Sequence, residues 1–314
     1  IGKAKEDVIA TQSDKLIADV AGRPKLDASA TAFYFGEPLN TMLPEYGFAP
    51  MVSVTQPIYT GGKIKYGKQM AETNIQMSNA QQRLVEDEVL LATETAYWLL
   101  VQAKEEIKLE QQVKKQLASH YTFLINQFGA GLIYKNDVLR AKVLQNENEA
   151  RLQAAENKLI LAKRRLSQLI GMEAPTGIDV ADTLSTGDFS NQGILQNTDA
   201  VRPEIDLAAN AVKIGELTKS MLKADLKPTV GLALNGVAAF GKEGINFGDP
   251  TKKHMLTYFG MLSVNIPVFD WGSKREKVKQ QEATIRSAEY GLKELKSQIN
   301  VEVEQATLNL QLQT

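Results

Sequence analysis

Hydrophobic residues recur every seven positions over one long stretch of the chain. The stripe consists of Met70, Met77, Leu84, Leu91 and Trp98, and no proline occurs between residues 63 and 127. A seven-residue hydrophobic repeat is typical of a coiled-coil helix. At 1.5 Å per residue, such a helix would be on the order of 100 Å long. The pattern therefore predicts a helix longer than the core of a small domain requires.

This helix is interrupted at Phe128-Gly129-Ala130-Gly131-Leu132, and a second helical pattern follows over 135–170. Its a and d positions are Val138, Ala141, Leu152, Ala155, Leu159, Ala162, Leu166 and Leu169, with Gln145 and Asn148 as polar exceptions. Alternating leucine and alanine lets two helices approach closely. Gly171 is expected to end the helix. We therefore expect residues 59–171 to form a long helical hairpin with its tip at 128–134.

Alternating apolar and polar residues predict strands elsewhere. They fall in two strand pairs, 23–58 and 227–269, whose loops lie at 36–48 and 241–256. Pro57 is expected to end its strand, because proline cannot donate to a sheet. Shorter helices are expected over 1–22 and 203–226. Residues 172–202 predict an irregular connection, and 270–314 the start of a second long helix, with Val278, Ile285, Leu292, Ile299 and Ala306 at seven-residue spacing.

The second half of the chain repeats the first. Pro57-Ile58-Tyr59-Thr60-Gly61-Gly62 matches Pro267-Val268-Phe269-Asp270-Trp271-Gly272 position by position. Each copy reads helix, strand, loop, strand, turn, long helix, which is an internal structural repeat. The first copy continues through a tip and a return helix, whereas the second stops at Thr314, which corresponds to Lys104. We expect that residues beyond 314, including a second tip, are missing from this chain.

Composition narrows the function. A formal net charge of -1 argues against a nucleic-acid partner, and the absence of cysteine excludes disulfides and thiolate chemistry. No run reaches the roughly 18 apolar residues that a membrane helix needs, so strands would have to carry any membrane-spanning role. His120 and His254 stand far apart, and no phosphate-binding, metal-binding or nucleophile motif is present. The sequence therefore predicts no enzyme, no catalytic residue, no metal and no cofactor.

The order of these elements resembles the TolC-type outer membrane efflux proteins. The tip Phe128-Gly129-Ala130-Gly131-Leu132 with the following Asp137-Val138-Leu139-Arg140-Ala141 is similar to that family's periplasmic turn, and Leu166-Ser167-Gln168-Leu169-Ile170-Gly171 to its helix ending. The resemblance covers nearly the whole chain. It implies an α+β membrane protein: a long antiparallel coiled-coil α-barrel, plus four strands per protomer in a trimeric transmembrane β-barrel. Closure by three protomers agrees with the cost of open sheet edges in lipid.

The resemblance also implies a function. The protein would be an outer membrane channel subunit of a tripartite efflux or type I secretion system in a Gram-negative bacterium, a homotrimer with a large periplasmic part. Its partners would be outer membrane lipid, a periplasmic adaptor protein and an inner-membrane pump. The alternatives are a periplasmic adaptor (membrane fusion) protein and a non-membrane coiled-coil scaffold. The duplicated strand pairs argue against the adaptor, and the lipid-facing alternation in all four strands argues against the scaffold. The family's gating residues lie in the second tip, so none is assigned here.

Two groups of residues are candidate sites, each with a structural and a functional interpretation. The tip comprises Gly129, Ala130, Gly131, Leu132 and Asp137. It is either an ordinary turn, with positive φ at Gly131, Leu132 as a packing staple and Asp137 favoured by the helix N-terminus, or an adaptor-docking site. Tyr59, Phe269 and Trp271 lie where strands meet helices. They are either junction packing or an aromatic girdle at the membrane boundary.

Overall fold

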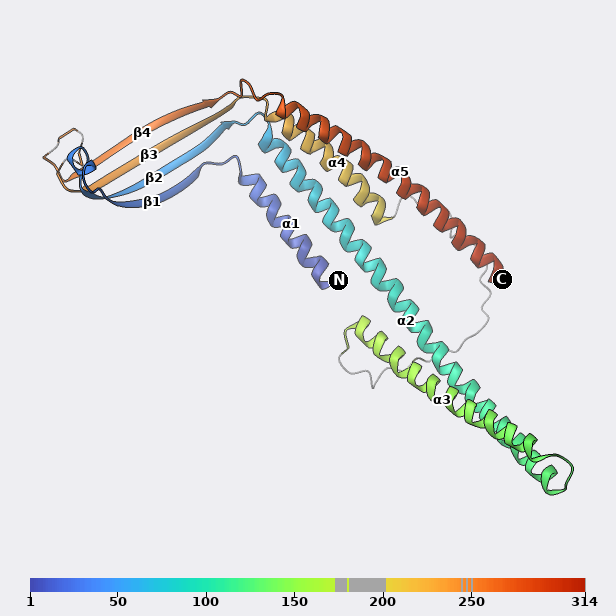
Figure 1. The fold of residues 1–314 in the computed structure, drawn as a ribbon. Coiled ribbons are helices and arrows are strands. Elements are labelled where there is room, and N and C mark those ends of the chain that lie inside the picture. The colour runs from blue at the N-terminus through green and yellow to red at the C-terminus, as the bar shows by residue number, and fades with distance from the viewer. Residues whose placement is uncertain (173–179, 181–201, 244, 247, 250, 314) are drawn as a thin grey trace. The chain divides into compact units, whose positions relative to one another are not determined.

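The computed structural model describes residues 1–172, 180, 202–243, 245, 246, 248, 249 and 251–313. The chain forms two compact units. The first contains 83–196 with both end residues, and the second contains 2–82 and 197–313. Almost all of the predicted connection 172–202 lies outside the described residues. The ribbon in Figure 1 follows the element order that the repeat predicts.

The second unit contains one antiparallel sheet in the order β1-β2-β3-β4 (Figure 1). The strands are β1 (Lys25–Tyr34), β2 (Tyr46–Tyr59), β3 (Thr229–Gly241) and β4 (His254–Asn265). The four predicted strands are therefore confirmed, and both strand pairs belong to a single sheet. β2 and β3 are the central strands, which leaves one edge of β1 and one edge of β4 without a strand partner among the described residues.

The ends of β2 and β4 differ from the prediction. β2 does not end at Pro57 but continues to Tyr59, with a shift of register between Pro57 and Tyr59. The last β1 partner of β2 is at Thr55, so the missing donor of Pro57 falls beyond the β1 ladder. β4 ends at Asn265 rather than at 269, and its last residue pairs with Thr229, where β3 begins.

Three helices accompany the sheet in this unit: α1 (Gly2–Val20), α4 (Pro203–Ala224) and α5 (Ser273–Gln313). Ion pairs join α1 to the start of the long helix, with Lys15 to Glu72 at 2.6 Å. Helix α4 packs along α5 (Figure 1), where a Cβ on Gly215 would lie 3.0 Å from Ile285. Ile285 and Ile299 are 6% and 2% exposed, which confirms the α5 stripe. Ala306 is exposed, and it lies beyond the start of α4, where Arg202 pairs with Glu302 at 3.2 Å.

The first unit is the helical hairpin. Helix α2 (Lys63–Gly129) has 67 residues and extends across both units, and α3 (Lys135–Ile170) has 36. The α3 stripe is confirmed, since Ala141, Asn148, Ala155 and Leu166 are all buried. No helix in the described part of the chain is both long and apolar enough to span a bilayer.

The α2 stripe is wrong over its second half. Leu91 and Trp98 are 66% and 53% exposed, whereas Ala96, Leu100 and Ala103 are buried. Ala96 and Leu100 pack with Leu166 of α3 in the core of this unit. The reason is that α2 carries more than one apolar face, and the strongest seven-residue repeat in the sequence is not the face that α3 covers.

Candidate functional site

The tip of the hairpin is closed by main-chain hydrogen bonds. The Gly131 N–H donates to the Phe128 carbonyl and the Leu132 N–H to the Gln127 carbonyl, each at 2.9 Å. Together with φ 72° at Gly131, these bonds form a Schellman motif. The predicted positive φ is therefore confirmed. The Ala130 N–H also returns to the Asn126 carbonyl at 3.1 Å, so the turn satisfies its own backbone.

Leu132 does not act as a staple at this turn. Its side chain is 69% exposed, and the neighbouring Phe128 and Tyr134 are 45% and 83% exposed. Nothing lies within 4 Å of where a Cβ would stand on Gly129 or Gly131. The apex of the hairpin therefore displays large apolar side chains that its own fold does not use.

Asp137 has a structural role in the first turn of α3. Its carboxylate accepts the Tyr134 N–H at 3.3 Å, while its own N–H donates to the Tyr134 carbonyl at 3.0 Å. The carboxylate thereby satisfies a main-chain donor that the start of a helix leaves free, and its charge suits that end of the helix dipole. These bonds are compatible with the structural interpretation of Asp137, and they do not test a role in docking.

The register of the sheet separates its residues into two chemically different faces. One face is mainly polar: it carries Lys25, Asp27, Ser29, Thr31, Ser53, Thr55, Asn235, Ser263 and Asn265, interspersed with Met51, Val237, Phe259 and Met261. The opposite face carries Leu26, Val52, Val54, Leu232, Leu234, Leu262 and Val264. A sheet with one apolar and one polar face suits a barrel wall with lipid outside and water inside. We therefore expect the mainly polar face to line the lumen.

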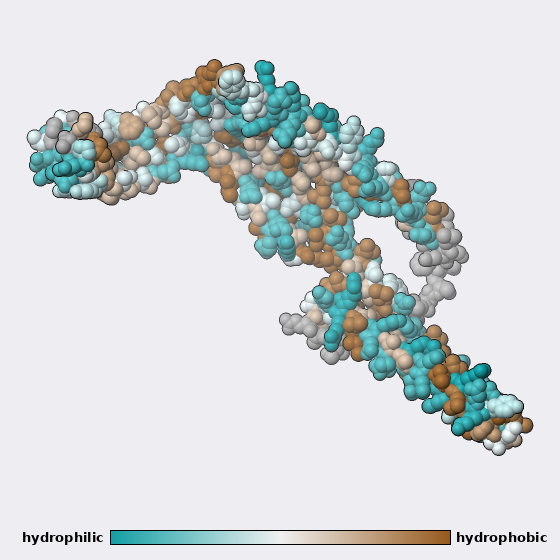
Figure 2. All heavy atoms as spheres, in the orientation of Figure 1, coloured by the Kyte–Doolittle hydropathy of each residue, from teal (hydrophilic) through white to brown (hydrophobic). Residues whose placement is uncertain are grey.

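The turn from β4 to α5 exposes its aromatic residues. Figure 2 shows hydrophobic residues gathered at the end of β4, where Val268 and Phe269 are 89% and 73% exposed. Trp271 is 90% exposed, and its ring centroid lies 4.9 Å from that of Phe269. Tyr59, at the equivalent turn of the first copy, is 47% exposed. Phe269 and Trp271 therefore pack on each other and are otherwise largely exposed in the single chain.

Trp271 is also the non-glycine residue with positive φ, at 56°, in the described part of the chain. The Asp270 carboxylate holds this geometry by accepting the Gly272 and Lys274 N–H groups at 3.1 and 3.0 Å. Its counterpart in the first copy is Gly61, with φ 66°. A bulky side chain in this region is unusual and costs free energy, which makes the position a candidate for function.

Sequence reasoning missed one residue on the mainly polar face of the sheet. Ile245, in the loop between β3 and β4, is 4% exposed. A Cβ on Gly47 or Gly241 would lie 2.9 or 3.0 Å from its Cδ1 atom, so two strand glycines make room for it. Gly47 and Gly241 share a face with Asn235 by register. The signal in the sequence was an isolated isoleucine in a polar loop opposite paired glycines.

Charged groups in the same loop are locally paired. Lys242 contacts Glu45 at 2.5 Å, and the hydrogen bond from the lysine to this carboxylate raises the pKa of Lys242. Hydrogen bonds from Thr251 lower the pKa of the Asp249 carboxyl. These contacts tie described residues of the loop to one another and to Glu45, which directly precedes β2.

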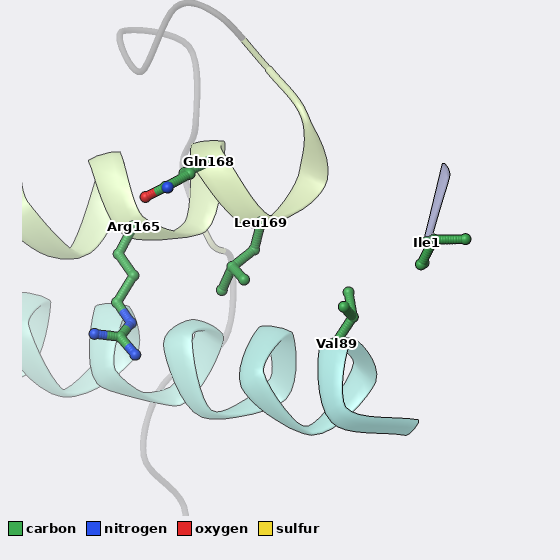
Figure 3. A pocket seen from close by; sticks show the side chains of 5 residues that line it. All are labelled: Ile1, Val89, Arg165, Gln168 and Leu169. Carbon is green, nitrogen blue, oxygen red and sulfur yellow. The ribbon is translucent and has the colours of Figure 1, made fainter. Parts of the chain in front are cut away.

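A hollow between α2 and α3 offers no catalytic chemistry. Its lining is Ile1, Val89, Arg165, Gln168 and Leu169 (Figure 3). Figure 3 shows Arg165 and Leu169 pointing from α3 toward α2, whereas Gln168 points away. The lining contains no carboxylate, histidine or hydroxyl nucleophile. Within the described ranges, no three His, Asp or Glu side chains gather in a way that could hold a metal ion.

A four-stranded sheet with one mainly apolar and one mainly polar face, in a chain that also contains a helix of 67 residues, is typical of subunits that assemble into an outer membrane channel. A family model described as "Outer membrane efflux protein" matches residues 1–172, more than half of the chain. The chain therefore belongs to the outer membrane efflux protein family. No curated protein matches the chain.

Solved structures share this fold at low sequence identity. A membrane protein from Pseudomonas aeruginosa aligns with TM-score 0.79 and 16% identity, over 98% of this chain and 70% of that one. The outer membrane protein VceC from Vibrio cholerae aligns with TM-score 0.76 and 16% identity, over 98% and 75%. The outer membrane channel CmeC from Campylobacter jejuni aligns with TM-score 0.75 and 16% identity, over 99% and 68%.

The chain is thus an outer membrane channel subunit of a tripartite efflux system, with a large periplasmic part. Members of the family are trimeric channels that work with an adaptor and an inner-membrane pump. The family membership excludes the periplasmic adaptor and the coiled-coil scaffold as alternatives. The single four-stranded sheet is the feature that neither alternative explains.

Proposed function

We propose that the apex of the α2–α3 hairpin docks the periplasmic adaptor, and that the channel is a passive, water-filled conduit. The energy for transport comes from the inner-membrane pump. The supporting observation is the exposure of Leu132 at a turn that is already closed by its own main-chain bonds. Because the fold does not need this side chain buried, a partner can bury it.

The free energy available at the apex is sufficient for a specific contact. Burying a leucine side chain fully is worth about 1.5–3 kcal/mol. Leu132 and Tyr134 are both largely exposed in each protomer, and a trimer presents three such tips. If the adaptor buries these apolar side chains at all three tips, the loss of one of them per protomer removes three contacts from the assembly.

The test is substitution of Leu132 with the turn left intact. Leu132→Asp is expected to abolish adaptor cross-linking and efflux-dependent drug resistance, while trimers still reach the outer membrane. Leu132→Met keeps an apolar side chain of similar size and is expected to retain both. Normal resistance in Leu132→Asp cells would contradict docking at the apex.

A second variant changes the turn instead of the side chain. Gly131→Pro cannot adopt φ 72°, because the proline ring fixes φ near about -65°. It is expected to remove docking by displacing the apex while Leu132 itself is unchanged. Trimer assembly, measured on semi-native gels, separates this effect from general misfolding.

We further propose that Tyr59, Phe269 and Trp271 lie at the periplasmic boundary of the membrane. The chain contains two tryptophans, Trp98 and Trp271, so Trp98→Phe leaves Trp271 as the sole indole fluorophore. Its emission is expected to be quenched in vesicles of lipids brominated near the headgroup. The reciprocal variant, Trp271→Phe, reports from Trp98 on α2 and is expected to be unaffected. Equal quenching of both variants would rule out a membrane-boundary position specific to Trp271.

A further inference from the structure

A buried polar pair lies in the otherwise apolar seam between α2 and α3. Asn148 is 1% exposed, and its amide Nδ2 donates to the Glu110 carboxylate at 2.5 Å and to the Glu110 carbonyl at 3.3 Å. Arg151 Nε lies 3.5 Å from the same carboxylate, whose side chain is 15% exposed. On α3 the same line of the helix carries Ala141, Ala155 and Ala162, so Asn148 interrupts a run of alanines.

One polar atom of the pair is left unsatisfied. The Asn148 Oδ1 atom is buried without a hydrogen-bond partner. A buried polar atom without a partner costs free energy that an alanine at this position would not. Gln145, one turn closer to the tip, reaches only the Leu117 carbonyl at 3.5 Å. Stability alone therefore does not explain why this seam contains an asparagine.

We infer that the Asn148–Glu110 pair is a register lock, which fixes how far α3 is shifted along α2 and hence which residues form the apex of the hairpin. Sliding α3 by one heptad in one direction would place Asn148 against Leu117 and Glu110 against Ala155. Sliding it in the other direction would place them against Ala103 and Ala141. Either slip buries the amide and the carboxylate without partners, whereas the surrounding leucine and alanine layers repack with little loss.

The register of α3 along α2 determines which residues form the turn, because the two helices are joined by a short turn. A one-heptad slip moves the apex by about half a heptad, which carries Gly131 and Leu132 from the turn into a helix. Asn148 and Glu110 are thus positioning residues for the tip. The lock itself is a property of the hairpin, and only its effect on efflux depends on the proposed docking.

The chain has no cysteine, so pairs of introduced cysteines report the register without background. The contacts of Leu117 with Gln145 and of Tyr121 with Lys142 continue by helical spacing to Leu124 and Val138, which we expect to form the next layer toward the tip. Leu124→Cys with Val138→Cys is expected to cross-link in the native register. Two further cysteine pairs report a slipped register, one for each direction: Leu117→Cys with Val138→Cys, and Phe128→Cys with Ala141→Cys. Each pair is one heptad out of register in the native hairpin, so it can bridge only after a slip, since disulfides need Cα atoms within about 7 Å.

The test combines these pairs with variants of the lock. Asn148→Ala is expected to move cross-linking from the native to a slipped pair by about tenfold or more, since an unpartnered buried amide disfavours a register by a similar factor. Asn146→Ala makes the same change at an exposed position of α3 and is expected to change nothing. Glu110→Gln keeps a hydrogen-bond acceptor for Asn148 and is expected to retain the native register.

Stability provides a second readout that separates the lock from ordinary packing. Glu110→Ala leaves Asn148 unpartnered and is expected to lower thermal stability. The double variant Glu110→Ala with Asn148→Ala is expected to recover stability but not register. An exclusively native cross-link in Asn148→Ala would overturn the lock, whatever the efflux result. A slipped cross-link with normal drug resistance would support the lock and contradict docking at the apex.

Discussion

Three glycines allow the same substitution to be compared in three environments. Gly67 lies in α2 with nothing within 4 Å of an added Cβ. Gly171 also has open space around it but adopts φ 75°, and Gly61 adopts φ 66° with the Ala224 carbonyl oxygen only 2.7 Å from the Cβ position. Alanine at these sites adds, in turn, no strain, backbone strain alone, and backbone strain with a collision.

The expected magnitudes follow from these geometries. Gly67→Ala is expected to stabilise by about 0.5–1 kcal/mol, because glycine is a poor helix residue. Gly171→Ala is expected to cost about 1–2 kcal/mol for the left-handed conformation. Gly61→Ala adds an overpacking cost of about 1–3 kcal/mol, since a carbonyl oxygen of the backbone cannot move aside as a flexible side chain can.

Urea unfolding of the detergent-purified protein, followed by circular dichroism, measures the series. All variants are compared at one protein concentration, because the stability of an oligomer depends on it. The expected order of stability is Gly67→Ala, wild type, Gly171→Ala and Gly61→Ala, from highest to lowest. Equal losses for Gly61→Ala and Gly171→Ala would show that the α4–β3 connection does not press on Gly61 and would refute the reasoning.

Three further predictions concern the sheet and its loop. Leu234→Lys, on the apolar face at mid-strand, is expected to destabilise the assembled trimer by about 2–4 kcal/mol per protomer, because a charged side chain facing lipid is costly. Asn235→Lys, on the opposite face, is expected to be tolerated. Semi-native gels measure the fraction of trimer in each variant. Gly47→Val is expected to displace Ile245 and to make the loop accessible to trypsin on intact cells; an unchanged digest would contradict the glycine cradle. Because the pKa of Asp249 is lowered in the folded protein, its ionised carboxylate stabilises the loop fully above the ordinary pKa of 3.8, and this stabilisation is lost as pH falls through the folded pKa. Amide exchange of the loop is therefore expected to become faster in acid. The Asp249→Asn variant is expected to lack this acid-dependent increase.

The elements that the sequence predicted well are those set by local signals, whereas the strand ends depend on neighbouring strands. Helix α3 was predicted to within a residue because glycines bound it at Gly131 and Gly171, and its stripe has one partner. The strands were placed correctly because alternation has a period of two. Their ends were not, because whether Pro57 breaks a strand depends on which neighbour lies beside it, and that neighbour is set by the sheet.

The candidate sites show the same division. The residues of the tip were identified from the sequence, but exposure alone distinguishes Leu132 as a staple from Leu132 as a docking side chain. Ile245 and the Asn148–Glu110 pair join residues far apart in the chain, so no local pattern reveals them. Trp271 matches Gly61 in the repeat, yet its retained positive φ appears only in three dimensions.

By itself, the sequence determined the order of elements, the hairpin with its Gly131 turn, the repeat and the alternation of the strands, because these depend on local conformational preference and periodicity. Tertiary structure decided which face of α2 is buried, where the strands end and which apolar side chains remain exposed. The physical reason is that α2 carries several apolar stripes of similar strength, so its sequence permits more than one packing. Only the position of α3 along it selects the buried stripe, and the same position leaves Leu132 exposed at the apex.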